Sequence, residues 1–290
     1  MSFANLDLNL EKTKAMLSGI KIPPRPTVIS ELMKEATLST PNMNKIANLV
    51  SSDPAMSAAV LKIANSAFIG LKTRVVSIPL AVLLLGAKNI CGISLGIQLN
   101  KSISQKSELT KFFWKYSSQM GMISKFIAQK VQYPAEDEAF LFGLFHEAGS
   151  IMLSQKFNDY SDRYFEFWRN NNSYFVEKEE KIYGVNHALV GALMAKMWEL
   201  PEHLVNVIAM HHERKEELMA SKIPYEQLRL YAILKFSESI VCIYNNFPDL
   251  KEWEEVKDIC IETLEIKNNA LKLAEECINL LDMEDSNFYN

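Results

Sequence analysis

The sequence predicts an all-α protein built as a multi-helix bundle. Apolar residues recur every three or four positions along most of the 290 residues, the spacing that places them on one side of a helix. Ten glycines and ten prolines are few for this length, and their scarcity favours long regular elements over turn-rich structure. No stretch alternates apolar and polar residues between hairpin turns, so we expect no substantial sheet.

The composition is that of a globular protein with a full hydrophobic core. Hydrophobic residues make up 48% of the chain and charged residues 23%, proportions that are typical of folded domains. The net charge of −4 offers no basic surface to nucleic acid, so we expect no such partner. The N-terminus has no long apolar stretch, and the cysteines form no CxxC pair. Both features indicate a cytoplasmic protein with reduced thiols.

The N-terminal part of the sequence predicts a series of short helices. Two segments on either side of the breaker Ser39–Asn42 carry the apolar residues Leu32, Ala36, Ile46, Leu49 and Val50. Asp53 and Pro54 then give an N-cap followed by proline in the first turn. The helix that they open has one buried face, made of Met56, Ala59, Val60, Ile63, Ala64 and Ala67, and Gly70 closes it.

The longest apolar stretch, Ile78–Leu99, is the only candidate for a membrane span. It contains Lys88, Asn89, Gln98 and three glycines, which a helix that crosses a bilayer rarely tolerates at its centre. We therefore expect two short core helices that meet near Gly86–Lys88, and no membrane insertion.

From Ser107 onward a second set of amphipathic helices is expected. The stripes consist of Phe112, Tyr116, Met120, Ile123 and Ile127; of Ala139, Phe142, Gly143 and His146; of His187, Val190, Gly191, Met194 and Trp198; and of Leu204, Val207, Ile208 and His211. A loop at Asn170–Asn172 separates two of these helices. A helix around Leu228–Tyr244 and an acidic amphipathic helix from Trp253 to Leu281 follow, before a loose tail at Glu284–Asn290. We expect Glu252–Glu255 to be a solvated helix start whose acids suit the helix dipole.

Four of the five histidines fall where a buried pocket would need them. The stripes place Tyr116, His146, His187 and His211 on the core-facing sides of four helices. Converging neutral imidazoles and a carboxylate are the ligand set of Zn²⁺, Mn²⁺ or Fe, although a single buried histidine is more often a hydrogen-bonded packing residue. Successive residues of a helix lie about 100° apart, so we expect His212 to diverge from His211, and Glu147 from His146. Gly143, one turn earlier, would let another helix approach closely.

Several ordered motifs between Ile20 and Asn245 resemble the HDOD domain. They are Ile22–Pro26 (IPPRP), Ser52–Ala55 (SDPA), Leu61–Phe68 (LKIANSAF), Ser77–Ile78, Leu84–Gly86, Ala139–Gly149 (AFLFGLFHEAG), Tyr183–Gly184, His187–Gly191, Trp198–Pro201 (WELP) and His211–His212. HDOD domains are similar to the HD superfamily of metal-dependent phosphohydrolases, which includes the HD-GYP cyclic-dinucleotide phosphodiesterases. The resemblance implies an HD-like helical subdomain over residues 107–246, preceded by an N-terminal subdomain over 1–106 and followed by a C-terminal helix and tail over 247–290.

The resemblance also implies where metal ligands would lie. The His-Asp doublet of the enzymes falls on His146 and Glu147, and their later histidines fall on His187, His211 and His212. Their first histidine falls on Tyr116, and their final aspartate on Glu238. A phenol with a pKa near 10 is a poor metal ligand at neutral pH, and each Glu in place of Asp moves a carboxylate by about 1.5 Å.

These departures argue against an intact binuclear hydrolase, so we expect no catalytic residues and no bound metal. They leave room for one weakly held divalent ion on Glu147 and the later histidines. Without a bound metal, we expect the pocket to be a self-satisfied polar network in which Glu147, Glu238 and the Tyr116 hydroxyl are the partners of the histidines.

The leading hypothesis is a non-enzymatic bacterial signal-transduction module that binds a protein partner or a small ligand through the degenerate pocket. HDOD domains are similar in usage to output modules beside receiver and diguanylate-cyclase domains. This chain shows no such appended domain, so we expect its input to arrive by association with signalling proteins. The alternative is a metal-dependent phosphohydrolase acting on a nucleotide or cyclic dinucleotide. In that case His146, His187, His211, His212, Glu147 and Glu238 would hold the metal. A nucleic-acid binder using the helix pair at Ser77–Leu99 is a third reading, which no basic face supports.

Overall fold

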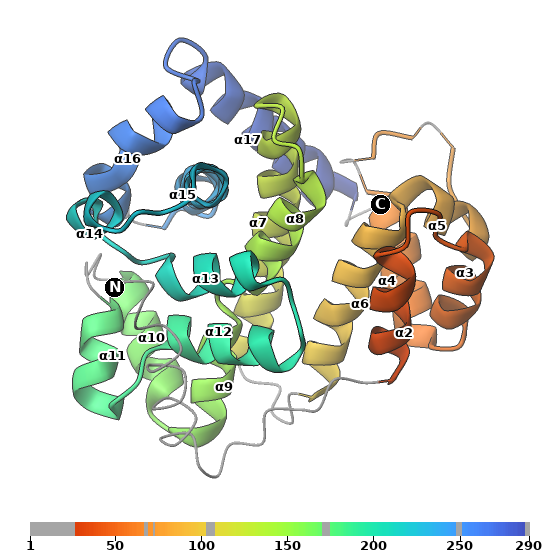
Figure 1. The fold of residues 1–290 in the computed structure, drawn as a ribbon, viewed down its shortest axis with the longest axis horizontal. Coiled ribbons are helices and arrows are strands. Elements are labelled where there is room, and N and C mark those ends of the chain that lie inside the picture. The colour runs from red at the N-terminus through yellow and green to blue at the C-terminus, as the bar shows by residue number, and fades with distance from the viewer. Residues whose placement is uncertain are drawn as a thin grey trace. The chain divides into compact units, whose positions relative to one another are not determined.

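The described part of the chain is helical, as the sequence predicts (Figure 1). The computed structural model describes residues 27–66, 69–71, 73–102, 108–169, 175–247 and 251–287, and none of these residues lies in a strand. The expected all-α class is therefore confirmed. Three sequence features, the IPPRP motif at 22–26, Ala67–Phe68 and the expected loop at 170–172, lie outside the described residues.

The chain divides into two compact units. The smaller one comprises residues 23–104 together with 279–290, and the larger one comprises 1–22 together with 105–278. The boundaries expected from the sequence, 1–106, 107–246 and 247–290, stay a prediction.

Among the described residues of the smaller unit, five complete helices follow one another closely along the chain. They are α2 (Thr27–Ala36), α3 (Met43–Ser51), α4 (Pro54–Ala64), α5 (Ile78–Leu85) and α6 (Ala87–Ser102). The expected cap of α4 is confirmed, because the Asp53 carboxylate accepts hydrogen bonds from the backbone N–H groups of Ala55 and Met56. Met56, Val60 and Ala64 form its buried face.

Helices α5 and α6 confirm the expected pair of short helices in the long apolar stretch. Gly86, with φ of +79°, separates them, and their axes are bent by 110°. The expectation that α5 is a core helix holds for one side only, because Leu80, Leu83 and Leu84 are 43–62% exposed. None of the described helices is by itself long and apolar enough to cross a membrane. Only α5 and α6 together reach that length, and they are sharply bent.

The larger unit carries the candidate site. Its helices are α7 (Glu108–Lys130), α8 (Glu136–Phe145), α9 (Ala148–Lys156), α10 (Tyr160–Arg169), α11 (Phe175–Tyr183), α12 (His187–Met197), α13 (Glu202–Met210), α14 (Lys215–Ala220), α15 (Tyr225–Tyr244) and α16 (Lys251–Thr263), with α17 (Ala270–Asn287) beginning in it. Helix α15 is buried along most of its length, from Leu230 to Cys242.

The C-terminal region differs from the sequence prediction. The single helix expected from Trp253 to Leu281 is two helices, α16 and α17, because Glu265 adopts a left-handed φ of +56° and ends α16. The next residue, Ile266, donates its N–H to the Ile261 carbonyl, the closing bond of a helix C-terminus. The loose tail expected at 284–290 is also wrong for Glu284–Asn287, which continue α17. Residues 288–290 are outside the described part.

Candidate metal centre

Glycines bring the helices that carry the site into backbone contact. A Cβ atom added at Gly149 on α9 would lie 1.9 Å from the His187 carbonyl oxygen and 2.7 Å from the Gly191 nitrogen on α12. A Cβ at Gly143 on α8 would lie 2.6 Å from the Met120 carbonyl oxygen on α7, so the expectation that Gly143 permits close approach is confirmed. Only glycine fits at such short separations. The first residue of α12 is thereby held against the start of α9.

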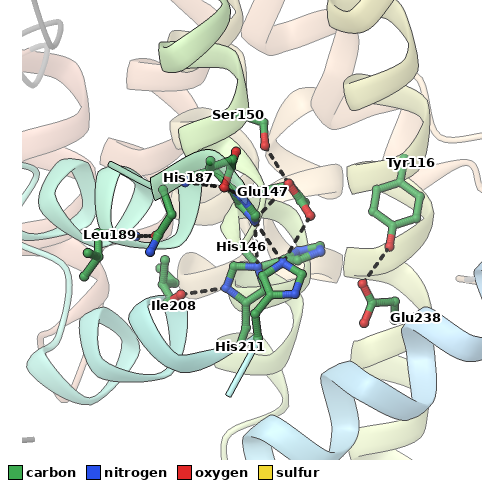
Figure 2. Close-up of polar contacts among 12 residues, drawn as sticks. Tyr116, His146, Glu147, Ser150, His187, Leu189, Ile208, His211 and Glu238 are labelled. Atoms are coloured by element: carbon green, nitrogen blue, oxygen red, sulfur yellow. Dashed lines mark hydrogen bonds and ion pairs between the residues drawn. The ribbon is translucent and has the colours of Figure 1, made fainter. Parts of the chain in front are cut away.

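The candidate residues come from the ends of these helices. His146 follows α8 and Glu147 caps α9, while His187 is the first residue of α12. His211 and His212 follow the last residue of α13. Figure 2 shows His146, His187, His211 and the Glu147 carboxylate gathered together, with Tyr116 and Glu238 to one side.

Four of the seven predicted site residues place their ligand atoms together. The Nε2 atoms of His187, His211 and His212 and the Glu147 carboxylate all lie within 4.8 Å of one another. His187 Nε2 is 3.3 Å from His211 Nε2 and 2.9 Å from His212 Nε2. It is also 3.6 Å from a Glu147 oxygen.

The expected divergence of His211 and His212 is wrong. That expectation assumed that both belong to one helix, but α13 ends at Met210 and the two histidines lie in the following turn. The helical rotation of about 100° per residue therefore does not apply to them. Both rings face His187 instead.

The outward nitrogen of each of these three histidines is fixed by an acceptor. The Nδ1–H groups of His187 and His212 donate to the carboxylates of Glu179 and Glu252, each over 2.7 Å. His211 Nδ1–H donates to the Ile208 carbonyl over 2.7 Å. A carboxylate or carbonyl cannot donate, so in a neutral ring Nδ1 carries the proton and Nε2 presents its lone pair. Three such lone pairs face one place, the arrangement that outer hydrogen bonds impose on metal-binding histidines.

The pKa shifts of His187 and His211 show how the cluster holds protons when no metal ion is bound. Burial lowers the pKa of His187, but the carboxylates of Glu179 and Glu147 outweigh it and raise the pKa to about 9. Burial and the neighbouring His212 hold the pKa of His211 well below its ordinary value. A proton on His187 would lie between nitrogens that compete for it. The donor set would fit one divalent ion, and our expectation that no metal is held stays a prediction.

The remaining predicted residues form the other side of the pocket. The buried Tyr116 hydroxyl donates to Glu238 over 3.4 Å, and burial raises the pKa of Tyr116 well above 10. The phenol therefore keeps its proton. Lys235 Nζ donates to Glu238 over 2.8 Å and to Glu252 over 3.0 Å. His146 donates from Nδ1 to the Gly143 carbonyl over 2.9 Å, and its buried Nε2 has no hydrogen-bond partner among the described residues.

Three residues with a part in this pocket were not predicted from the sequence. Glu179 is 1% exposed and accepts from Tyr160 as well as from His187. Lys235 is also 1% exposed. The expectation that Glu252 is part of a solvated helix start is wrong, because its side chain is 18% exposed and bonded to His212 and Lys235. The three-residue spacing of Lys235 and Glu238 was the available signal, since such residues are neighbours on a helix.

An acidic hollow of about 220 Å³ lies next to the cluster, with His212 among its lining residues. Four carboxylates line it, those of Glu177, Glu180, Glu213 and Glu217, together with one cation, Arg214. Burial and the neighbouring Glu217 raise the pKa of Glu213 to about 7. The surface around His212 therefore attracts cations and repels phosphate groups.

The fold and the site together define a class of protein, a helical protein with a histidine–carboxylate cluster between helix ends. Comparison with protein families matches residues 22–214 to the HDOD domain. The chain belongs to the HDOD domain family. The match ends before α15 and α16, so Lys235, Glu238 and Glu252 lie beyond it.

Solved structures with the same fold support this membership. An HDOD domain protein of unknown function from Geobacter sulfurreducens is 19% identical, with a TM-score of 0.68 over 94% of this chain and 98% of that one. A presumed phosphohydrolase from Shewanella amazonensis SB2B is 23% identical, with a TM-score of 0.68 over 92% and 94%. A presumed signal transduction protein from Marinobacter aquaeolei VT8 is 18% identical, with a TM-score of 0.70 over 97% and 64%. At these identities the likeness shows the fold.

One curated relative, an uncharacterized protein from Treponema pallidum (strain Nichols), is 23% identical over 213 residues. The match covers 72% of this chain and 42% of the relative. The chain therefore spans about two fifths of that protein's length.

Proposed function

We propose that this chain is a non-enzymatic signal-transduction module of the HDOD family whose pocket binds one divalent metal ion. The observation that carries the proposal is the convergence of three Nε2 atoms and the Glu147 carboxylate within 4.8 Å. The outer nitrogen of each histidine is already fixed by Glu179, Ile208 or Glu252. The donors are thus oriented before any ion arrives, which lowers the cost of binding.

The number and type of the donors favour a borderline transition metal. Three imidazoles and a carboxylate suit Zn²⁺, and they also suit Mn²⁺ or Fe²⁺. Four protein donors complete the usual coordination of zinc, whereas catalytic zinc sites have three protein ligands and an open position. The side chains of His187 and Glu147 are 0% and 3% exposed, and that of His212 is 10% exposed. This enclosure supports an ion that regulates conformation over one that meets a substrate.

The Tyr116 side of the pocket gives a second argument against hydrolysis. Glu238 already accepts hydrogen bonds from Tyr116 and Lys235. Its carboxylate is therefore engaged by protein groups, and the protonated phenol adds no ligand. The acidic hollow beside His212 also disfavours the approach of a phosphoester.

The runner-up is a metal-dependent phosphohydrolase acting on a nucleotide or cyclic dinucleotide. The histidine–carboxylate donor set favours it, because an ion bound there would polarise a phosphoryl oxygen and lower the pKa of a bound water molecule.

Signalling proteins are the partners we propose for the module, since HDOD domains resemble output modules in usage.

The experiment is metal binding and hydrolysis measured on the same preparation. Chelator-stripped protein should bind one Mn²⁺ or Zn²⁺ per chain in a calorimetric titration, with a rise in melting temperature and no turnover of phosphodiester, cyclic-dinucleotide or nucleotide substrates. His187→Ala should abolish the binding, whereas His203→Ala, which removes a histidine bonded to Glu138 instead, should leave it intact. No binding by the parent protein would refute the metal site, and metal-dependent turnover lost in His187→Ala would establish the enzyme.

A further inference from the structure

Lys235 is a buried cation held between carboxylates from two helices. Its side chain on α15 is 1% exposed, and its Nζ lies 2.8 Å from Glu238 on the same helix and 3.0 Å from Glu252 on α16. A buried ammonium is strongly destabilising unless it is paired in this way. The ammonium in turn stabilises the two carboxylates, whose side chains are 3% exposed for Glu238 and 18% exposed for Glu252.

The bonds of Lys235 connect the two sides of the pocket. Glu252, one of its acceptors, also fixes Nδ1 of His212 in the metal cluster. Glu238, its other acceptor, receives the Tyr116 hydroxyl. Lys235 therefore lies where the acceptors of the metal cluster and those of the Tyr116 side come together.

On the Tyr116 side of the pocket, one buried nitrogen is available as a further metal ligand. His146 is fully buried, and its Nε2 has no hydrogen-bond partner among the described residues. Its ring lies 5.9 Å from that of Tyr116 and 5.3 Å from that of His211. A buried imidazole nitrogen without a hydrogen-bond partner is destabilising, and a metal ion is one group that would bind it. The acids on this side are Glu147, which follows His146 in the chain, and Glu238, which accepts the Tyr116 hydroxyl.

We propose that Lys235 is a tethered cation that takes the place of a second metal ion beside His146 and Glu238, and so limits the pocket to one ion. This inference rests on the proposed single-metal site. A lysine ammonium carries one charge and three donors on a flexible stem, so it satisfies Glu238 and Glu252 without binding His146. If Lys235 takes the place of a metal ion, the Nε2 atom of His146 is left without the ion that it would have bound.

The test compares metal stoichiometry in Lys235→Ala and in the parent protein, with Mn²⁺ as the probe. Removing both the charge and the side-chain volume should raise the bound Mn²⁺ from one to two per chain, measured by equilibrium dialysis and elemental analysis. Lys235→Ala/Glu238→Gln should return to one ion, because the vacated position then lacks its carboxylate. Lys235→Met, which fills the space with an uncharged chain, should also stay at one. A stoichiometry that does not rise in Lys235→Ala overturns the proposal.

The outcomes separate this proposal from the preceding one. A parent protein that binds no Mn²⁺ refutes the proposed function, whereas the difference between Lys235→Ala and the parent tests the tethered cation. Should Lys235→Ala unfold without metal, thermal melting across a Mn²⁺ titration decides the matter. Cooperative folding restored by Mn²⁺ supports the proposal, and a chain that stays unfolded at saturating Mn²⁺ overturns it. Lys257→Ala, on the exposed pair with Glu254, should match the parent throughout.

Discussion

Gly149→Ala should dismantle the metal centre without touching a ligand. The added Cβ would lie 1.9 Å from the His187 carbonyl oxygen, and ordinary van der Waals contact begins at about 3.4 Å. Helix α12 must therefore move away from α9 by roughly 1.5 Å at His187, the difference of these two distances. Metal donors tolerate errors of only about 0.2 Å, so the Nε2 cluster cannot keep its geometry.

The expected results are a loss of Mn²⁺ and Zn²⁺ binding and a destabilisation of about 1–3 kcal/mol, typical of overpacking. Calorimetric titration measures the first, and urea unfolding of the metal-free protein measures the second. Gly191→Ala is the matched control at the same interface. Its Cβ would lie 3.3 Å from an Ile208 methyl group and 3.4 Å from the Gly149 nitrogen, so it should bind metal nearly as the parent does. Metal affinity unchanged in Gly149→Ala would refute this account of the site.

Three further predictions follow from the charges around the cluster. Lys235→Met should cost about 3–5 kcal/mol of unfolding free energy by removing the cation that Glu238 and Glu252 share, whereas Lys257→Met on an exposed pair should change the unfolding free energy little; equal losses in urea unfolding would contradict the buried ion pair. Glu252→Gln should weaken metal affinity about 10–100-fold in calorimetry, although it provides no ligand; unchanged affinity would remove Glu252 from the site. The pKa of His187 is raised to about 9, above its unfolded value of about 6.5, so its stabilisation of the metal-free protein is full below pH 6.5. It should fall by about 3 kcal/mol as the pH rises through 9, and the same pH series on Glu179→Gln should lose most of this slope.

The sequence could predict the fold class because the signals of a helix lie within its own few turns of sequence. The apolar spacing along α4, α7 and α12, and the cap at Asp53 and Pro54, depend only on neighbouring residues. The break between α16 and α17 was not predicted because Glu265, not glycine, takes the left-handed conformation there. A non-glycine residue with positive φ gives no sequence signal.

Apolar stripes predicted part of the site, and the resemblance to the HDOD domain added Glu147, His212 and Glu238. Tyr116, His146, His187 and His211 fall on such stripes and are buried. Glu179 and Glu252 belong to helices rich in charged residues, EKEEK on α11 and KEWEE on α16, which are typical of solvated surfaces. Their burial depends on contacts with histidines of other helices or turns, His187 and His212, which the apolar periodicity within one helix does not reveal.

The placement of the cluster at helix ends explains how a bound ion could serve a signal. Glu147 directly precedes α9, His187 begins α12, and His211 and His212 directly follow α13. An ion joining these donors would fix three helix ends to one point, and through Glu252 it would also constrain α16. Without the ion, close contacts between imidazole nitrogens and a competing proton take its place. Under the proposed function, the two states would differ in the attachment of four helices rather than in access for a substrate, and a two-state element of this kind is what a regulatory module requires.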